Sequence, residues 1–126
     1  AAGHRVTAAG RSAARLAPLA RAGATAVEVD LADADAVRRM VAGHDAVVNL
    51  ATHMPPSTLR MVMPGAWREN DRVRREGAAN LVDAAIAGGA TRFVQESFAP
   101  IYEDAGDRRV DERAPVRPTP PGGRPR

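Results

Sequence analysis

The side chains that could hold a polar ligand lie in four short stretches of the chain. These stretches are the segments 9–12, 30–31, 49–53 and 97–102. Arg11 supplies a guanidinium, Asp30 a carboxylate, and Thr52 and Ser97 supply hydroxyl groups. Each stretch lies at or just after the carboxyl end of a predicted β-strand, and parallel sheets bind ligands beyond those ends. These segments are therefore the candidate site.

Two residue types that carry covalent chemistry are absent from the 126 residues. There is no cysteine, and all 18 basic residues are arginine. The chain therefore has no thiol nucleophile, no thiolate metal ligand and no lysine for a Schiff base. The three histidines are scattered, and His53 has no second histidine or carboxylate at metal-ligand spacing, so we expect no metal site.

The composition is that of one globular domain, with 44% hydrophobic and 26% charged residues. No apolar run approaches the roughly 20 residues that span a bilayer, and the chain has no secretory signal pattern at its start. We therefore expect a cytoplasmic protein without a membrane partner. The net charge is +3, but aromatic residues make up only 3% of the chain, and we expect no nucleic-acid partner.

Four segments have the length and residue content of strands. They are 4–8 (HRVTA), 24–31 (ATAVEVDL), 45–51 (DAVVNLA) and 91–96 (TRFVQE). The third is almost continuously apolar, which is typical of a strand covered on both faces. Because predicted helices alternate with these strands, we expect parallel pairing and a doubly wound α/β fold.

Three helices are predicted between the strands. The clearest begins at Asp33 as its N-cap and carries the apolar stripe Val37, Met40 and Val41. A short helix is expected over 18–22 with Pro18 in its first turn. A long one is expected over 66–87, with Arg72 paired to Glu76 on its outer side.

The composition changes near the C-terminus. Five prolines fall in the last twelve residues, and the segment has no apolar periodicity. We expect a partial dinucleotide-binding domain over 1–112 and a disordered Pro/Arg-rich tail over 113–126.

Five segments in this order resemble the extended short-chain dehydrogenase/reductase superfamily, in its NAD-dependent epimerase/dehydratase branch. They are 3–11 (GHRVTAAGR), 26–33 (AVEVDLAD), 42–51 (AGHDAVVNLA), 76–97 (EGAANLVDAAIAGGATRFVQES) and 100–102 (PIY). The resemblance implies a partial Rossmann-like sheet and the NAD(P)-binding segment of an oxidoreductase or epimerase. In complete relatives the partners are a dinucleotide cofactor and a small-molecule substrate. The oligomeric state, monomer or homo-oligomer, is left open.

The resemblance also implies roles at the first strand end. Arg11, with Ser12 beside it, falls where the family clamps the 2′-phosphate of NADP, and a guanidinium fork suits phosphate. No acidic residue stands between Val6 and Ser12 to accept from a ribose diol, so NADP is expected over NAD. The alternative for Arg11 is a solvent-exposed loop arginine.

At the second strand end, the resemblance implies that Asp30 and Leu31 form the acidic and apolar pair that contacts the adenine ring of the cofactor. The alternative for Asp30 is a helix cap, for which Asp33 is better placed. Leu50, Ala51 and Thr52 would lie beside the ribose and diphosphate.

The catalytic candidate is Ser97. It aligns with the first position of the family's serine pair, whereas Phe98 occupies the second, which usually bonds the substrate. Tyr102, the only tyrosine, matches a noncatalytic position, so it is not assigned as the acid.

Two of the family's motifs are absent from these 126 residues. They are the glycine-rich G-x-x-G-x-x-G turn, which normally precedes the first segment, and the Tyr-x-x-x-Lys pair, which normally follows the serine. We therefore expect a segment truncated at both ends, catalytically incomplete and weak in cofactor binding. The alternative is a noncatalytic Rossmann-like interaction module.

The missing glycine turn normally follows the central strand of the family's sheet, so that strand is missing too. The family order is 3-2-1-4-5, and the four predicted strands correspond to 2, 3, 4 and 5. An empty central place would leave two strand edges without partners. The chain can pair 4–8 directly with 45–51 in the order 3-2-4-5, borrow a strand from another molecule, or remain partly unfolded. Of these three outcomes we expect the direct pairing.

Overall fold

The computed structural model describes residues 3–54, 57, 59, 63, 65–97 and 101–117. Its contacts divide the chain into two compact units, Ala1–Gln95 and Glu96–Arg126. In the second unit, Tyr102 forms an isolated antiparallel bridge with Val116. The domain boundary at 112 and the disordered tail over 113–126 stay predictions, and residues 118–126 lie outside the described residues.

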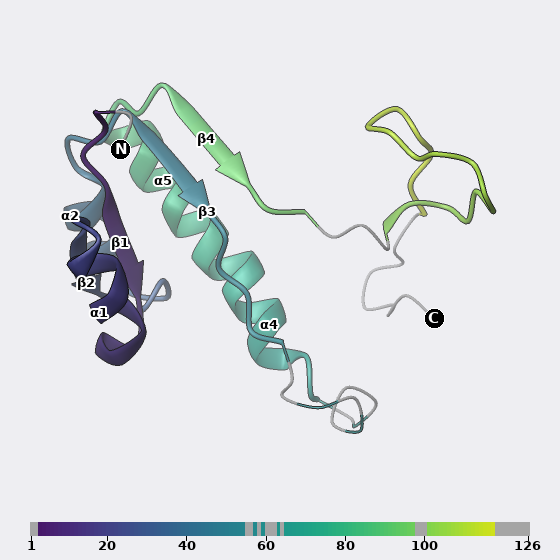
Figure 1. Ribbon diagram of the computed structural model, residues 1–126, viewed down its shortest axis with the longest axis horizontal. Helices are drawn as coiled ribbons and strands as arrows, with labels where there is room; N and C mark the ends of the chain where they lie inside the picture. Colours follow the sequence, from purple (N-terminus) through teal and green to yellow (C-terminus); the bar gives the residue numbers. More distant parts are fainter. Residues whose placement is uncertain are drawn as a thin grey trace. The chain divides into compact units, whose positions relative to one another are not determined.

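The strands of the first unit form two parallel pairs. β1 (Thr7–Gly10) pairs with β2 (Thr25–Glu28), and β3 (Ala46–Asn49) pairs with β4 (Arg92–Gln95). Figure 1 shows helices connecting these strands, as parallel pairing requires. The predicted α/β class with a partial Rossmann-like arrangement is confirmed.

The predicted direct pairing of 4–8 with 45–51 is wrong, because β1 and β3 belong to separate two-stranded sheets. A groove of about 410 Å³ lies between them, lined mainly by apolar residues of both strands and by Met40, Val41 and Leu81. His44, which precedes β3, spans the groove with a 2.8 Å contact between its Nε2 and the Thr7 hydroxyl. A side-chain contact therefore connects the two segments where backbone hydrogen bonds between strands were expected.

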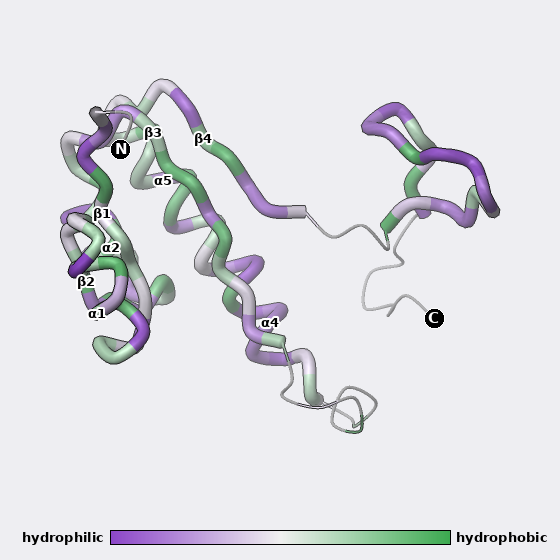
Figure 2. The backbone as a smooth tube through the Cα atoms, viewed as in Figure 1, coloured by the Kyte–Doolittle hydropathy of each residue, from purple (hydrophilic) through white to green (hydrophobic). Residues whose placement is uncertain are grey.

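β3 also differs from its prediction as a strand covered on both faces. Its residues alternate, with Val47 and Asn49 buried and Ala46 and Val48 exposed. Val48 keeps 59% of its surface exposed. Figure 2 shows apolar residues running along β3, so its composition is apolar although one face is open.

The first two helices follow their local signals to different degrees. α2 (Ala34–Val41) begins at Asp33, whose carboxylate accepts from the Ala36 N–H at 3.0 Å, as predicted. α1 (Ala13–Arg21) begins well before the expected 18–22, so Pro18 lies in its interior rather than in its first turn. The alanine-rich start of α1 explains this, since alanine has the highest helix propensity.

The predicted long helix is present over Arg68–Ala87 in three parts. α4 (Arg68–Arg72) passes into η1 (Val73–Gly77), one turn of π-helix, and then into α5 (Ala78–Ala87). Figure 1 shows them as one continuous rod. Gly89 after α5 has φ +73°, a left-handed conformation that favours glycine and ends the helix.

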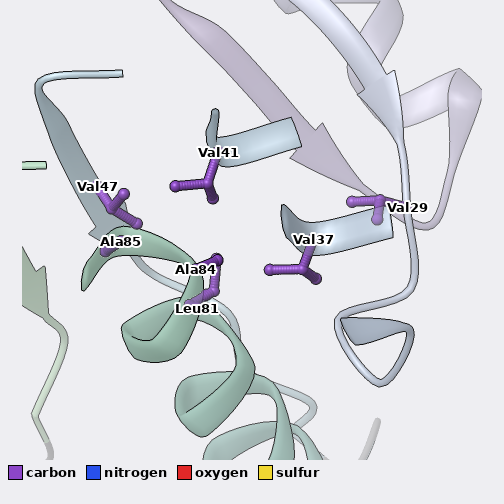
Figure 3. Close-up of a cluster of buried hydrophobic side chains, with 7 residues drawn as sticks. All are labelled: Val29, Val37, Val41, Val47, Leu81, Ala84 and Ala85. Carbon is purple, nitrogen blue, oxygen red and sulfur yellow. The ribbon is translucent and has the colours of Figure 1, made fainter. Parts of the chain in front are cut away.

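The core lies where α2 packs against α5, beneath the strands. Val37, at 0% exposure, and Val41 carry the predicted stripe of α2, and Leu81 and Ala84 meet them from α5. Figure 3 shows these side chains gathered with those of Val29, Val47 and Ala85. Val27 of β2 and Phe93 of β4 also pack against this cluster, so it connects the two sheets through one pair of helices.

Candidate functional site

Seven of the eight predicted site residues lie just after the carboxyl ends of three parallel strands of the first unit. Arg11 and Ser12 follow β1, Asp30 and Leu31 follow β2, and the segment 50–52 follows β3. Parallel strands present such ends on one edge, which is where open α/β sheets bind ligands. Leu31, Leu50 and Ala51 also line the groove between the two sheets.

One turn of helix, α4, contacts the segments after all three strands. Glu69 bonds Arg11 after β1, Asn70 bonds the segment after β3, and Arg72 approaches Asp30 after β2. Because β1 and β3 do not pair, this turn joins the carboxyl ends of the two sheets. Figure 1 shows α4 at the far end of the rod from the α5–β4 connection.

Two guanidiniums converge on the Glu69 carboxylate. Arg11 Nη1 donates to Oε1 at 2.8 Å, and Arg72 donates from Nη2 to Oε1 and from Nε to Oε2, both at 3.0 Å. The hydrogen bond from Arg72, and then that from Arg11, lower the pKa of the Glu69 carboxyl from 4.5 to about 2. The same pairing raises the pKa of Arg72. Glu69 is therefore an anion across the ordinary pH range.

Arg11 has a second contact on the loop after β3. Its Nη2 lies 3.3 Å from His53 Nδ1. A guanidinium can only donate, so this contact requires an unprotonated Nδ1. Arg72, which was predicted to pair with Glu76, instead donates its hydrogen bonds to Glu69, and its Nη2 lies 3.9 Å from Asp30 Oδ2.

The loop after β2 is held by its own turn and by the long helix. Asp30 Oδ1 accepts from the Ala32 N–H at 3.0 Å, and Asn80 Nδ2 donates to the Leu31 carbonyl at 2.8 Å. The Leu31 side chain sits against Gly77, where an added Cβ would lie 2.9 Å from Leu31 Cβ. Thus the π-turn of η1 ends at a glycine that makes room for the loop. π-turns are frequent at functional sites.

Two buried asparagines fix the loop after β3. Asn49 Nδ2 donates to Gln95 Oε1 at 2.8 Å, and its Oδ1 accepts from the Ala51 N–H at 3.0 Å. Asn70 Oδ1 accepts from the Thr52 hydroxyl and from the His53 N–H, both at 3.1 Å. The positions of Ala51 and Thr52 are therefore set by amide side chains, and Asn49 is structural.

Sequence reasoning missed four residues of the site: Glu69, Asn70, Arg72 and Asn80. All four lie on the long helix, far along the chain from the loops that they contact; 58 residues separate Arg11 from Glu69. The sequence pattern places Glu69 and Arg72 on a charged helix surface and Asn80 on the repeating helical stripe. The burial of Asn70, at 6% exposure, has no local signal.

The two remaining hydroxyl candidates contribute less to this arrangement. The Ser12 carbonyl accepts from the Arg15 and Leu16 N–H groups and begins α1, and its side chain forms no cap bond. Ser97 is exposed in the second unit, and its catalytic role stays a prediction.

Neither a metal-binding cluster nor a membrane-spanning helix is found in the described part of the chain. Residues 3–54, 57, 59, 63, 65–97 and 101–117 contain no group of three or more His, Cys, Asp or Glu side chains that could hold a metal ion. Among the same residues, no helix has the length and apolar content needed to cross a bilayer.

Comparison with known proteins gives a family and two relatives. The model of a family described as NAD(P)H-binding matches residues 1–118. The chain is 37% identical over 116 residues to the 3-diazoavenalumate denitrifying reductase of a Streptomyces species, covering 90% of this chain and 36% of that protein. It is 34% identical over 97 residues to the dTDP-glucose 4,6-dehydratase of Streptomyces niveus, covering 75% of this chain and 27% of that protein.

The chain spans roughly a third of the length of these relatives. The comparisons confirm the resemblance to extended short-chain dehydrogenases and the assignment as an NAD(P)-binding segment. An NAD(P)H-binding family is consistent with the parallel α/β arrangement of the first unit. This chain belongs to the NAD(P)H-binding family.

Proposed function

We propose that the first unit binds the adenosine half of NADP in preference to that of NAD, as the cofactor segment of a reductase or epimerase. The observation that supports this most is the position of Arg11. It follows β1, and its side chain is 46% exposed, so a phosphate can reach the guanidinium. Arginine binds phosphate oxygens through two parallel N–H donors.

The neighbouring residues suit the rest of an adenosine group. The Asp30 side chain is 49% exposed and would accept from the adenine amine, with Leu31 packing beside the ring. Leu50, Ala51 and Thr52 would lie along the ribose and diphosphate. When bound, the cofactor supplies or accepts a hydride at its nicotinamide. The residues named here bind and orient the adenosine end.

The catalytic step is proposed for the whole protein, of which this chain is a segment. By resemblance, Ser97 would hold the substrate oxygen, and the substrate would be a small molecule oxidised, reduced or epimerised at a carbinol carbon. A cytoplasmic location and a homo-oligomer also stay predictions.

The test compares NADPH with NADH on the full 126-residue chain. Nicotinamide fluorescence is followed in a titration of the unaltered chain, of Arg11→Ala, and of Arg39→Ala as a control arginine exposed on α2. We expect weak binding with a preference for NADPH that Arg11→Ala removes and Arg39→Ala keeps. Loss of the phosphate contact should weaken NADPH binding about 10-fold, since charge-assisted bonds contribute about 1.5–3 kcal/mol and the site is partly exposed.

Two results would contradict the proposal. Tighter binding of NADH, unaffected by Arg11→Ala, would show that Arg11 does not meet a phosphate. Absence of saturable binding for both dinucleotides would favour the noncatalytic interaction module.

A further inference from the structure

In the local sequence, no acidic residue lies between Val6 and Ser12, and this absence favours NADP over NAD. The fold brings an acidic residue to that place from elsewhere in the chain. Glu69, on α4, lies with Oε1 2.8 Å from Arg11 Nη1. A carboxylate is thus present at the arginine expected to select the phosphate.

The geometry at Glu69 is that of an anion held between two arginines. Oε1 accepts from both Arg11 and Arg72, and Oε2 accepts from Arg72 Nε, with all three distances between 2.8 and 3.0 Å. A phosphate monoester presents the same kind of acceptor oxygens to the same donors. The position is therefore already filled by a tethered anion.

We infer that Glu69 is a specificity-determining residue that competes with the 2′-phosphate for Arg11 and Arg72, so that it reduces the preference for NADP over NAD. The inference rests on the proposed function, because it takes Arg11 as the phosphate-binding residue. Arg72 is then a second arginine of the same phosphate site. When no 2′-phosphate is present, the Glu69 carboxylate is available to accept a hydrogen bond from a ribose hydroxyl.

The exposure of the three side chains makes the competition reversible. Arg11, Glu69 and Arg72 keep 46%, 33% and 36% of their side-chain surface exposed. Exposed ion pairs contribute little net stability, because water and salt screen them. A phosphate with a charge of about −1.5 to −2 can therefore displace the carboxylate, but it must do so against that contact.

The experiment uses two probes that differ only in the position of the phosphate, adenosine 2′-monophosphate and adenosine 5′-monophosphate. Their affinities for the full chain are measured by calorimetry at low salt for the unaltered chain and for Glu69→Gln, which keeps the side-chain shape. Asp83→Asn, an exposed acid on α5, is the control for the same change in net charge. Arg72→Gln is a second variant, which tests the other side of the proposed site.

We expect Glu69→Gln to tighten binding of the 2′-isomer by about 3- to 10-fold, with less than a twofold change for the 5′-isomer. Asp83→Asn should leave both affinities unchanged, and Arg72→Gln should weaken the 2′-isomer selectively. An equal gain for both isomers, or no gain for the 2′-isomer, overturns the inference. A Glu69→Gln variant that shows no saturable binding of the 2′-isomer also overturns the inference.

The proposed function can fail separately from this inference. If the 2′-isomer responds as expected but neither NADPH nor NADH binds, the dinucleotide function is wrong and the competition at the phosphate site stands. If NADPH is preferred through Arg11 and Glu69→Gln changes nothing, the inference alone is wrong.

Discussion

Replacing Asn70 with alanine tests how α4 fixes the loop that follows β3. Asn70 Oδ1 is the acceptor for two donors on that loop, the Thr52 hydroxyl and the His53 N–H, each at 3.1 Å. Alanine removes the acceptor and leaves both donors to find water. The change should therefore loosen the loop without disturbing the core.

The size of the effect follows from three contributions. Two hydrogen bonds contribute about 0.5–1.5 kcal/mol each, or about 1–3 kcal/mol together. Thr52 and His53 are exposed, so water can replace part of this and the lower half of the range applies. Alanine also gains about 0.5 kcal/mol over asparagine in a helix. We expect a net loss of about 0.5–1.5 kcal/mol in the free energy of unfolding.

The assay is urea unfolding followed by circular dichroism, with Thr52→Val as the partner change in a double-mutant cycle. The cycle isolates the bond between the Thr52 hydroxyl and Asn70, for which we expect a coupling of about 0.5–1.5 kcal/mol. The slope of the unfolding transition should stay constant, since neither change exposes core surface. Additive effects within about 0.3 kcal/mol would refute the reasoning, because the two side chains would then not interact.

Three other changes test the site and the core. Because the pKa of Glu69 is about 2 rather than 4.5, its ion pairs should stabilise the fold fully above about pH 4.5 and be lost as the pH falls toward 2; an NMR titration of Glu69 with a midpoint near 4.5 would contradict this. Gly77→Ala places a Cβ 2.9 Å from Leu31 Cβ, which should cost about 1–3 kcal/mol through overpacking. This cost should exceed the gain of about 1 kcal/mol in helix propensity, so the protein should lose stability. An unchanged or higher urea midpoint would count against the close contact. Val37→Ala should cost about 2–3 kcal/mol by the same assay, whereas Val82→Ala on the exposed side of α5 should cost less than about 1 kcal/mol; equal losses would show that the core is placed wrongly.

The elements that could be predicted from the sequence are those set by neighbouring residues. Asp33 and the stripe that follows it define α2, because a cap and a helical period are local signals. The strands β1, β2 and β3 were predicted in the right order, although β1 runs over Thr7–Gly10 rather than 4–8, and β2 and β3 end before the predicted 31 and 51. The order alone was enough to bring Arg11, Asp30 and Thr52 to one edge. That part of the site needed no knowledge of distant contacts.

What could not be predicted depends on contacts between distant segments. The exposure of Val48 reflects which faces of β3 the helices cover, and apolar composition does not report that. The π-turn of η1 and the close approach of Gly77 to Leu31 depend on a loop 46 residues earlier in the chain. Glu69 meets Arg11 only because α4 crosses the ends of both sheets. Long-range placement of this kind has no signature in residue spacing.

The division of the strands into two sheets has a mechanical consequence. In a continuous sheet, backbone hydrogen bonds transmit a displacement from each strand to the next. Within the described residues of the first unit, β1–β2 and β3–β4 share no such ladder, and they are joined by helix packing, by the contact of His44 with Thr7, and by α4 at the opposite ends. A ligand that touches both Arg11 and Thr52 would add a further brace across the two sheets, so its binding should stiffen the molecule more than binding to one sheet alone.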